Sequence, residues 1–325
     1  MKTRLCIYAL VLLALMSCKR MPLYDMEETT VTLRLSLDLD IHLDIPDDKQ
    51  VDIEIERSIK KPEYHKVLFY SPEDGRQLYS EFVTTYGGHI SVPSGSYRML
   101  AYGFGTEYVQ IRGEGDINTI EAFTSDITAT KSATLAACTR GSEDVPQGPI
   151  IYAPDHLLVV NDSVEIPAFT GEAQEIVIRA TCRTIVKTYS FEVDSVIGAQ
   201  YIESCEAFVT NQARTSFFGR GEVSQEPATL CFPVGVDRKH GSLYTTFNTF
   251  GKLPGESRSF LHIVVRDTGG KEYYFTQDIT EQFENPEHHI VIKDEIDIPK
   301  PETHGSGIAP TVDPWEEEIH DVPIG

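Results

Sequence analysis

The stretch VTLRLSLDLDIHLDI, residues 31–45, alternates apolar and polar side chains without interruption. Every second position from Val31 to Ile45 is valine, leucine or isoleucine, and the positions between them carry Thr, Arg, Ser, Asp and His. A period of two residues is typical of a β-strand with one face buried and the other in water. The stretch therefore predicts a long strand, from Thr30 to Ile45, near the start of an all-β chain.

The rest of the chain repeats this pattern in shorter runs. Alternating or β-branched runs bounded by turn residues predict strands at 51–55, 66–70, 89–92, 96–102, 157–160, 175–186, 190–193, 207–210, 228–232, 259–266, 272–277 and 289–293. Turn signals separate them, and Asp267-Thr268-Gly269-Gly270 is typical of a hairpin loop. Helix signals are weak, since 116–123 and 279–283 suit only a turn or two. Many short strands with regular turns predict β-sandwiches.

The first eighteen residues have the pattern of a secretory signal. Lys2 and Arg4 precede an apolar stretch of 12 residues, which is shorter than the ~20 needed to cross a bilayer. The stretch ends at Ser17-Cys18, a junction that resembles the bacterial lipobox, in which the cysteine is acylated and becomes the new amino terminus. An ordinary signal peptide followed by an incidental cysteine is the alternative. Because more than one acyl chain, palmitate for example, anchors durably, we expect a lipoprotein tethered to the membrane at Cys18.

The composition argues against two classes of partner. The formal net charge is −22, and removal of residues 1–17, which hold two basic and no acidic residues, lowers it to −24. So acidic a surface repels nucleic acid and anionic lipid head groups. We therefore expect no nucleic-acid partner and a membrane contact made through the lipid alone.

Four cysteines remain once Cys6 leaves with the signal and Cys18 carries lipid: Cys138, Cys182, Cys205 and Cys231. An exported compartment permits disulfides, and four cysteines allow three pairings. No two have the CxxC spacing of a zinc or redox site. A bridge would join two of the last three, which lie on strand-like segments. Buried free thiols packed as small hydrophobes are an equal alternative.

Motifs for catalysis, metals and cofactors are missing from the sequence. It contains no G-x-S-x-G, H-E-x-x-H or EF-hand pattern. His288 and His289 are adjacent, so a regular strand would point them to opposite faces. Asp38, Asp40 and Asp44 on the polar face of the first strand are candidate calcium ligands, but a solvated face that discourages edge pairing is the commoner case. We expect no enzyme activity, no metal and no cofactor.

Two changes of pattern divide the chain. Strand patterning breaks near 167–171, and prolines and acidic residues replace it after Ile298. The predicted organisation is a signal peptide at 1–17, a lipidated tether at 18–28, an N-terminal β-sandwich at 29–170, a C-terminal β-sandwich at 171–298 and a proline-rich acidic tail at 299–325.

Several patterns together resemble an uncharacterised lipoprotein family of the Bacteroidales that is related to fimbrillin-like proteins and minor fimbrial anchor subunits. They are the lipobox followed by Leu23-Tyr24-Asp25, PSGSYRMLAYGF at 93–104, TFNTFG at 246–251, and IPKP at 298–301 leading to Trp315. The resemblance implies two tandem transthyretin-like β-sandwich domains, anchored by lipid to the outer membrane at the cell surface. In that superfamily, pilin subunits polymerise when an N-terminal strand is removed by proteolysis and a neighbour's strand fills the groove. Anchor subunits keep their lipid.

Two classes of function follow. The first is a structural or adhesive surface lipoprotein, such as a fimbria-like anchor or accessory subunit with fimbrillin-like partners. The alternative is a glycan-binding lipoprotein of an outer-membrane uptake system, whose glycan the sequence leaves unknown. Sugar binding usually uses exposed aromatic side chains, and a single tryptophan in a proline-rich tail is weak support for it.

The tail is the predicted docking element for a partner. Cleavage downstream of the first strand, at Arg57, Lys60 or Lys61, would sever the lipid-bearing segment, so we expect an anchor to keep this strand and meet its partner elsewhere. The candidate contacts are the apolar residues of the tail: Trp315, Ile319, Val322 and Ile324.

Two tripeptides are candidate O-glycosylation sites. Asp162-Ser163-Val164 and Asp194-Ser195-Val196 match the Asp-Ser/Thr-apolar acceptor pattern of exported Bacteroidales proteins, which the resemblance makes relevant. A glycan is bulky and needs an exposed acceptor. Ser163, expected in a loop, is the better candidate.

Overall fold

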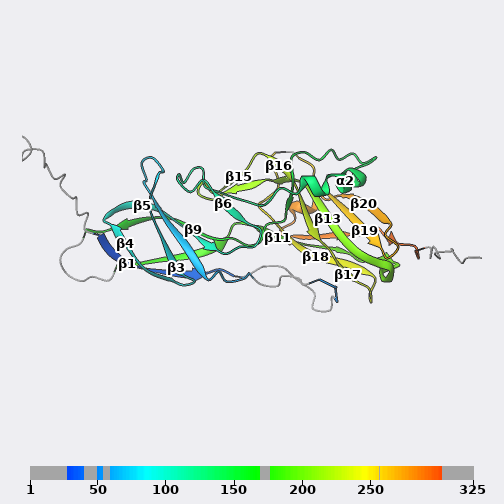
Figure 1. Cartoon of the computed structure of the whole chain (residues 1–325), viewed down its shortest axis with the longest axis horizontal. Helices are drawn as coiled ribbons and strands as arrows, with labels where there is room; N and C mark the ends of the chain where they lie inside the picture. The colour runs from blue at the N-terminus through cyan, green and yellow to red at the C-terminus, as the bar shows by residue number, and fades with distance from the viewer. Residues whose placement is uncertain (1–27, 40–49, 54–58, 169–175, 256, 302–325) are drawn as a thin grey trace, which may run out of the picture.

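The computed structural model describes residues 28–39, 50–53, 59–168, 176–255 and 257–301. Most of them lie in strands, which confirms the all-β prediction. Figure 1 shows a β-unit at each end of the elongated molecule and smaller strands between them. In the part of the chain described, no helix is long and apolar enough to span a membrane.

The first unit contains seven strands: β1 (Glu28–Leu37), β2 (Tyr64–Tyr70), β3 (Gln77–Thr84), β4 (Gly87–Pro93), β5 (Gly95–Phe104), β9 (Leu158–Ile166) and β10 (Ile176–Thr184). They form one sheet that closes into a barrel in the order β1-β10-β9-β5-β2-β3-β4. The alternation read from the sequence sets the inner face, since Val31, Leu33 and Leu35 are at most 5% exposed. Inward side chains of all seven strands form a single core.

The first strand is integral to this barrel. It pairs antiparallel with β4 from Glu28↔Pro93 to Arg34↔Gly87, and parallel with β10 from Val31↔Ile176 to Leu37↔Cys182. It ends at Leu37, short of the predicted Ile45, and residues 40–45 lie outside the described part of the chain.

The second unit contains two larger sheets. The first comprises β11 (Lys187–Val193), β17 (Gly235–Asp237), β18 (Ser242–Thr249) and β21 (His289–Ile292), in the order β17-β18-β11-β21. The second comprises β8 (Ile150–Tyr152), β13 (Ile202–Ala213), β16 (Pro227–Pro233), β19 (Phe260–Asp267) and β20 (Glu272–Asp278), in the order β20-β19-β13-β16-β8. One hydrophobic core contains side chains of both sheets.

Shorter elements complete the structure. Strand β12 (Val196–Ile197) follows β11 and pairs in parallel with β22 (Ile296–Asp297), the last strand of the described chain. The elements η1 (Ala199–Tyr201) and η2 (Gln282–Glu284) are single 3-10 turns. A small sheet runs in the order β15 (Glu222–Val223), β14 (Thr215–Phe217), β7 (Glu121–Phe123), β6 (Gln110–Arg112). A separate buried cluster joins the outer side of the barrel, at Leu68 and Leu100, to Phe218 and Phe250. The barrel is therefore packed against the rest of the chain.

The connection between β1 and β2 also contacts the second unit. The Asp52 carboxylate accepts hydrogen bonds from the Val236 backbone N–H at 2.8 Å and from Arg238 Nη1 at 2.6 Å. The Gln50 N–H donates to the carboxylate of Asp237 at 3.1 Å. The predicted strand at 51–55 is not seen at residues 51–53, and Gln50 and Asp52 instead hold the edge strand β17 through these bonds.

Sheet membership divides the chain differently from the predicted boundary at 170/171. The strand β10, predicted to belong to the C-terminal sandwich, lies in the barrel, and β8, predicted to belong to the N-terminal one, pairs with β16 in the second unit. The sheet of the first unit also closes on itself, whereas two separate sheets were expected there. These features depend on pairing between distant segments, and a period-two pattern does not predict which strands pair.

The sequence also missed some elements. The helix α2 (Thr128–Cys138) was not predicted, because it buries only Leu135 and Cys138 and so lacks a clear apolar stripe. The segment 116–123 forms the expected helical turn, in which the Ile120 N–H donates to the Asp116 carbonyl oxygen at 3.0 Å, and then ends in strand β7. The strands β3 and β18 were not predicted either. The hairpin at Asp267–Gly270 is confirmed, joining β19 to β20.

Candidate functional site

Three arginines lie on the outer face of the barrel beside the first strand. Because β1 and β10 are parallel and in register, Arg34 is the direct neighbour of Arg179, and Ser36 is the neighbour of Thr181. Arg183 lies two residues after Thr181, on the same face of β10. All five side chains are exposed. A chain with a net charge of −22 thus presents a local cluster of positive charge here.

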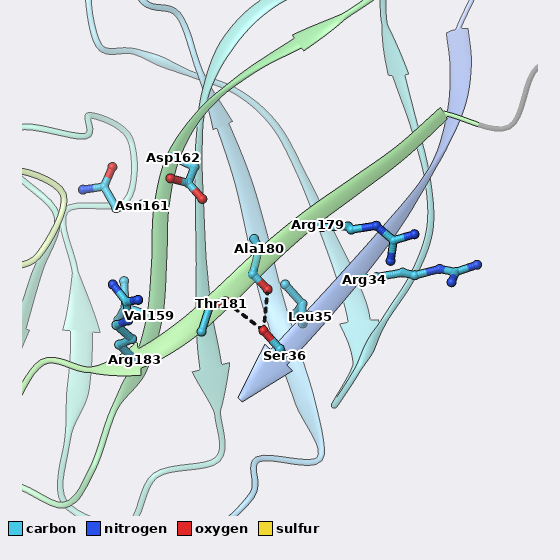
Figure 2. A pocket seen from close by; sticks show the side chains of 10 residues that line it. All are labelled: Arg34, Leu35, Ser36, Val159, Asn161, Asp162, Arg179, Ala180, Thr181 and Arg183. Atoms are coloured by element: carbon cyan, nitrogen blue, oxygen red, sulfur yellow. Dashed lines mark hydrogen bonds between the residues drawn. The ribbon is translucent and has the colours of Figure 1, made fainter. Parts of the chain in front are cut away.

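The strands β9 and β10 separate beside these arginines. They are consecutive and antiparallel, yet they pair only at Arg183↔Val159 and Thr184↔Leu158, the ends farthest from the connection between them. Figure 2 shows β10 turning away from β9, with Arg34 and Arg179 side by side. The divergence leaves an open hollow of about 710 Å³, which we call the arginine hollow. It is lined by Arg34, Leu35, Ser36, Val159, Asn161, Asp162, Arg179, Ala180, Thr181 and Arg183.

The lining of the arginine hollow is polar wherever it meets water. Its apolar members, Leu35, Val159 and Ala180, are all buried, and the other side chains are exposed and polar or charged. Asp162 occupies a position of β9 where alternation with Val160 and Val164, which pack on the barrel core, would place an apolar residue. The carboxylate remains exposed there.

Hydrogen bonds hold parts of this lining in place. Ser36 Oγ lies 2.8 Å from Thr181 Oγ1, linking β1 to β10. Asn161 Nδ2 donates to the carbonyl oxygens of Phe218 and Gly219, at 3.1 and 2.9 Å, and its Oδ1 accepts from Arg98 Nη2 at 2.9 Å. The Asn161 amide is therefore held in one orientation by the protein itself.

A second exposed surface, on β2, β3, β5 and the turn between β3 and β4, is aromatic. Tyr64, Phe82, Tyr86 and Phe104 are each more than half exposed. The rings of Phe82 and Phe104 are 5.7 Å apart, edge to face. Lys66 Nζ is 5.8 Å from the centre of the Phe82 ring. Exposed aromatic clusters of this kind are typical of places where another molecule docks.

The two predicted acceptor serines are both exposed. Ser163 lies within strand β9, paired with Arg98, although a loop was expected. Ser195 lies between β11 and β12, and its Oγ is 3.4 Å from the Glu295 carboxylate. Exposure permits modification of either serine, and the modification itself stays a prediction.

The remaining predicted site residues lie outside the described part of the chain. These are the lipidation residue Cys18 and the docking residues Trp315, Ile319, Val322 and Ile324. Of the candidate calcium ligands only Asp38 is described, and it lies 3.9 Å from Arg183 Nε. Within the described residues no cluster of three or more His, Cys, Asp or Glu is arranged to hold a metal.

The four cysteines are free and buried. Burial raises the pKa of Cys138, Cys182 and Cys231 to about 12 and also raises that of Cys205. These thiols stay protonated at neutral pH and are poor nucleophiles. The structure thus favours packed small hydrophobes over disulfides.

Sequence reasoning missed the arginine hollow. Its signal was present, since the polar alternate positions are Arg34 and Ser36 in LRLSL at 33–37 and Arg179, Thr181 and Arg183 in IRATCR at 178–183. What the sequence lacked was the parallel pairing that places these two segments side by side.

These observations define an all-β protein whose barrel carries one exposed charged surface and one exposed aromatic surface. Residues 40–233 match the model of a family described as Domain of unknown function (DUF5119), and the chain belongs to that family. A protein of Bacteroides ovatus, provisionally named the fimbrium anchoring subunit Fim4B, is 27% identical over 296 residues, covering 79% of this chain and 83% of the relative. The resemblance read from the sequence is therefore confirmed.

A solved structure shares the fold. A crystal structure of a B. ovatus protein, provisionally described as an adhesin, superposes with a TM-score of 0.56 at 21% identity, covering 85% of this chain and 94% of that one. The fimbrial anchor protein Mfa2 from Porphyromonas gingivalis gives a TM-score of 0.43 at 15% identity, covering 78% and 83%.

Proposed function

We propose that this protein is a lipid-anchored subunit at the outer surface of the cell that holds a fimbria-like assembly, without enzymatic activity. The similarity to the relative named as a fimbrium anchoring subunit supports the class. The single observation that carries the anchoring role is the position of β1 in the barrel.

A tether at Cys18 would enter the fold directly through β1. The strand begins at Glu28, ten residues after that cysteine, and is hydrogen-bonded to β4 on one side and to β10 on the other. A force applied to Glu28 along the axis of β1 would load both ladders of hydrogen bonds together instead of opening them one at a time. Such a strand suits a subunit that bears load.

Retention of β1 also distinguishes an anchor from a polymerising subunit. Lys60 and Lys61 downstream of it are exposed, so a protease could reach them. Cleavage there would break the covalent link between the lipid-bearing strand and the rest of the chain. We therefore propose that this bond stays intact in the mature protein.

We further propose that the barrel and the two-sheet unit are two transthyretin-like domains. Their separate cores support this division. The sheet pairings support placing β10 with the first domain and β8 with the second.

The lipid anchor is tested by removing its acceptor. Cys18→Ala should move the protein from the membrane fraction to the soluble fraction, because the remaining chain has no other predicted membrane segment. Cys6→Ala, a change in the apolar part of the signal, is the matched control and should leave fractionation unchanged. Mass spectrometry of the parent should find acyl groups at Cys18. A Cys18→Ala protein that stays with membranes, and a parent without acyl groups, would end the proposal.

The docking role of the tail is tested by deleting residues 300–325. The fold should survive, because Ile296 and Ile298 are each 1% exposed and the Ile298 N–H still donates to the Ile197 carbonyl oxygen at 2.9 Å. We expect an unchanged melting temperature and loss of co-purification with the fimbria-like polymer.

A full-length variant separates the role of the tail's apolar residues from the loss of chain length. It carries serine at four positions, Trp315, Ile319, Val322 and Ile324, and should fail in the same way as the deletion. Capture of the partner by the truncated chain would place docking elsewhere, with the aromatic surface of Tyr64, Phe82, Tyr86 and Phe104 as the next site to test.

A further inference from the structure

We propose that the arginine hollow binds an acidic polysaccharide, one that carries carboxylate or sulfate groups along its length. This ligand goes beyond the anchoring role, and its test does not involve membrane attachment. The inference rests on the charge of the hollow, the spacing of its arginines and the chemistry of its lining.

The charge of the hollow selects an anion. Arg34, Arg179 and Arg183 gather on one face of two parallel strands, in a chain whose net charge repels anions elsewhere. A guanidinium group presents a planar fork of donors that matches a carboxylate or a sulfate. The salt bridge from Arg183 to Asp38 is long, at 3.9 Å, and both side chains are well exposed. Such a pair is weak and yields readily to a competing anion.

The spacing of the arginines favours a polymer over a single small anion. Arg34 and Arg179 are neighbours across one strand spacing, which is roughly 5 Å. Arg183 lies four residues further along β10, roughly 13 Å from Arg179 at the usual rise of a strand. One compact anion suits the Arg34–Arg179 pair, whereas an extended chain with repeated charges can reach all three.

The lining favours a sugar over a protein. Protein interfaces usually centre on an apolar or aromatic anchor, and every apolar residue of this hollow is buried. What the hollow exposes are hydroxyl, amide and carboxylate groups: Ser36, Thr181, Asn161 and Asp162. The hydroxyl and carboxylate groups exchange hydrogen bonds with sugar hydroxyls, and Asn161 Oδ1 can accept one more, since both its N–H groups already donate to backbone carbonyl oxygens. Asn161 is already oriented by Arg98 and by the carbonyl oxygens of Phe218 and Gly219, which lowers the entropy lost on binding.

The test measures binding of the full mature chain, in detergent, to four defined polymers by titration calorimetry. Heparin supplies sulfate, polygalacturonate supplies carboxylate, dextran is a neutral sugar, and poly-L-glutamate is an acidic peptide. We expect binding to one or both of the acidic polysaccharides and none to dextran. The affinity should fall as salt is raised, because exposed charges are screened.

Matched variants locate the site. Arg183→Gln should weaken binding about tenfold, the usual effect of losing one charge-assisted hydrogen bond, and Arg179→Gln together with Arg183→Gln should weaken it further. Arg76→Gln is the control, because Arg76 lies outside the hollow in a matching environment. Its side chain is 72% exposed and 3.9 Å from the Asp74 carboxylate, and that of Arg183 is 75% exposed and 3.9 Å from the Asp38 carboxylate. Asp162→Asn should tighten binding severalfold by removing a negative charge from the lining. All these substitutions are at exposed positions, so the melting temperature of each variant should be unchanged.

Three results would overturn the proposal. The first is that neither acidic polysaccharide binds at low salt. The second is an equal loss of affinity in Arg183→Gln and Arg76→Gln, which indicates a diffuse charge effect. The third is tighter binding of poly-L-glutamate than of either polysaccharide, which assigns the hollow to an acidic protein. None of these bears on membrane fractionation of Cys18→Ala, so the two proposals fail separately.

Discussion

Leu33→Asp is expected to unfold the barrel. The Leu33 side chain is 1% exposed and lies in the core formed by all seven barrel strands. A carboxylate there would be buried without a partner, or would force β1 out of the sheet, at a cost of about 4 kcal/mol or more. We expect a protein that fails to accumulate, or one whose melting temperature falls by about 10 °C or more.

The matched control is Thr32→Asp, one residue earlier on the same strand. Thr32 points to the other face, and its hydroxyl lies 3.1 Å from His89 Nδ1. An aspartate at this position stays in contact with water, so the melting temperature should change by only about 2 °C. Circular dichroism of the two variants compares the two faces of one strand. Equal losses of stability would mean that β1 does not divide buried from exposed side chains as described.

Gly87→Ala is expected to separate β1 from β4. Gly87 has φ = +106°, and a Cβ there would lie 2.0 Å from the Leu33 carbonyl oxygen. The added carbon meets backbone, which cannot rotate away as a side chain can. We expect a loss of about 3 kcal/mol or more, since the clash adds to the strain of a positive φ.

Gly105→Ala isolates the strain from the clash. Gly105 has a similar φ of +96°, but a Cβ there meets nothing within 4 Å. The expected loss is about 1 kcal/mol, the usual cost of this backbone conformation for alanine. Urea unfolding and limited proteolysis compare the two variants. A Gly105→Ala loss as large as that of Gly87→Ala would show that contact with β1 is not the cause.

The first strand also shows how far local pattern reaches. Alternation from Val31 to Leu37 correctly predicted a strand and its buried face, because side-chain direction in a strand is a property of neighbouring residues. The same alternation could not predict that β10 would be its parallel partner. The helix α2 was not predicted because it buries only two residues, too few to produce a clear periodic pattern in the sequence.

The exposed charged and aromatic surfaces show the same limit of prediction from local pattern. Arg34 and Arg179 are 145 positions apart in the chain, so no spacing rule links them. Phe82 and Phe104 fall on strands, where aromatic residues usually read as core, and yet both are more than half exposed. Whether an aromatic ring on a strand is buried depends on what covers that face of the sheet.

Local sequence was enough to predict the strand class of the chain, the inner face of β1 and the resemblance to its family. It also supplies the lipobox pattern at Cys18 on which the proposed anchor depends. These features are encoded within short windows, where the period of the pattern and the chemistry of a motif are enough. Three features are visible only in the three-dimensional structure: the closed barrel, the membership of β10 in the first unit and of β8 in the second, and the arginine hollow. Each of these depends on pairing between strands far apart in the chain, and that pairing is selected by the packing of the whole core.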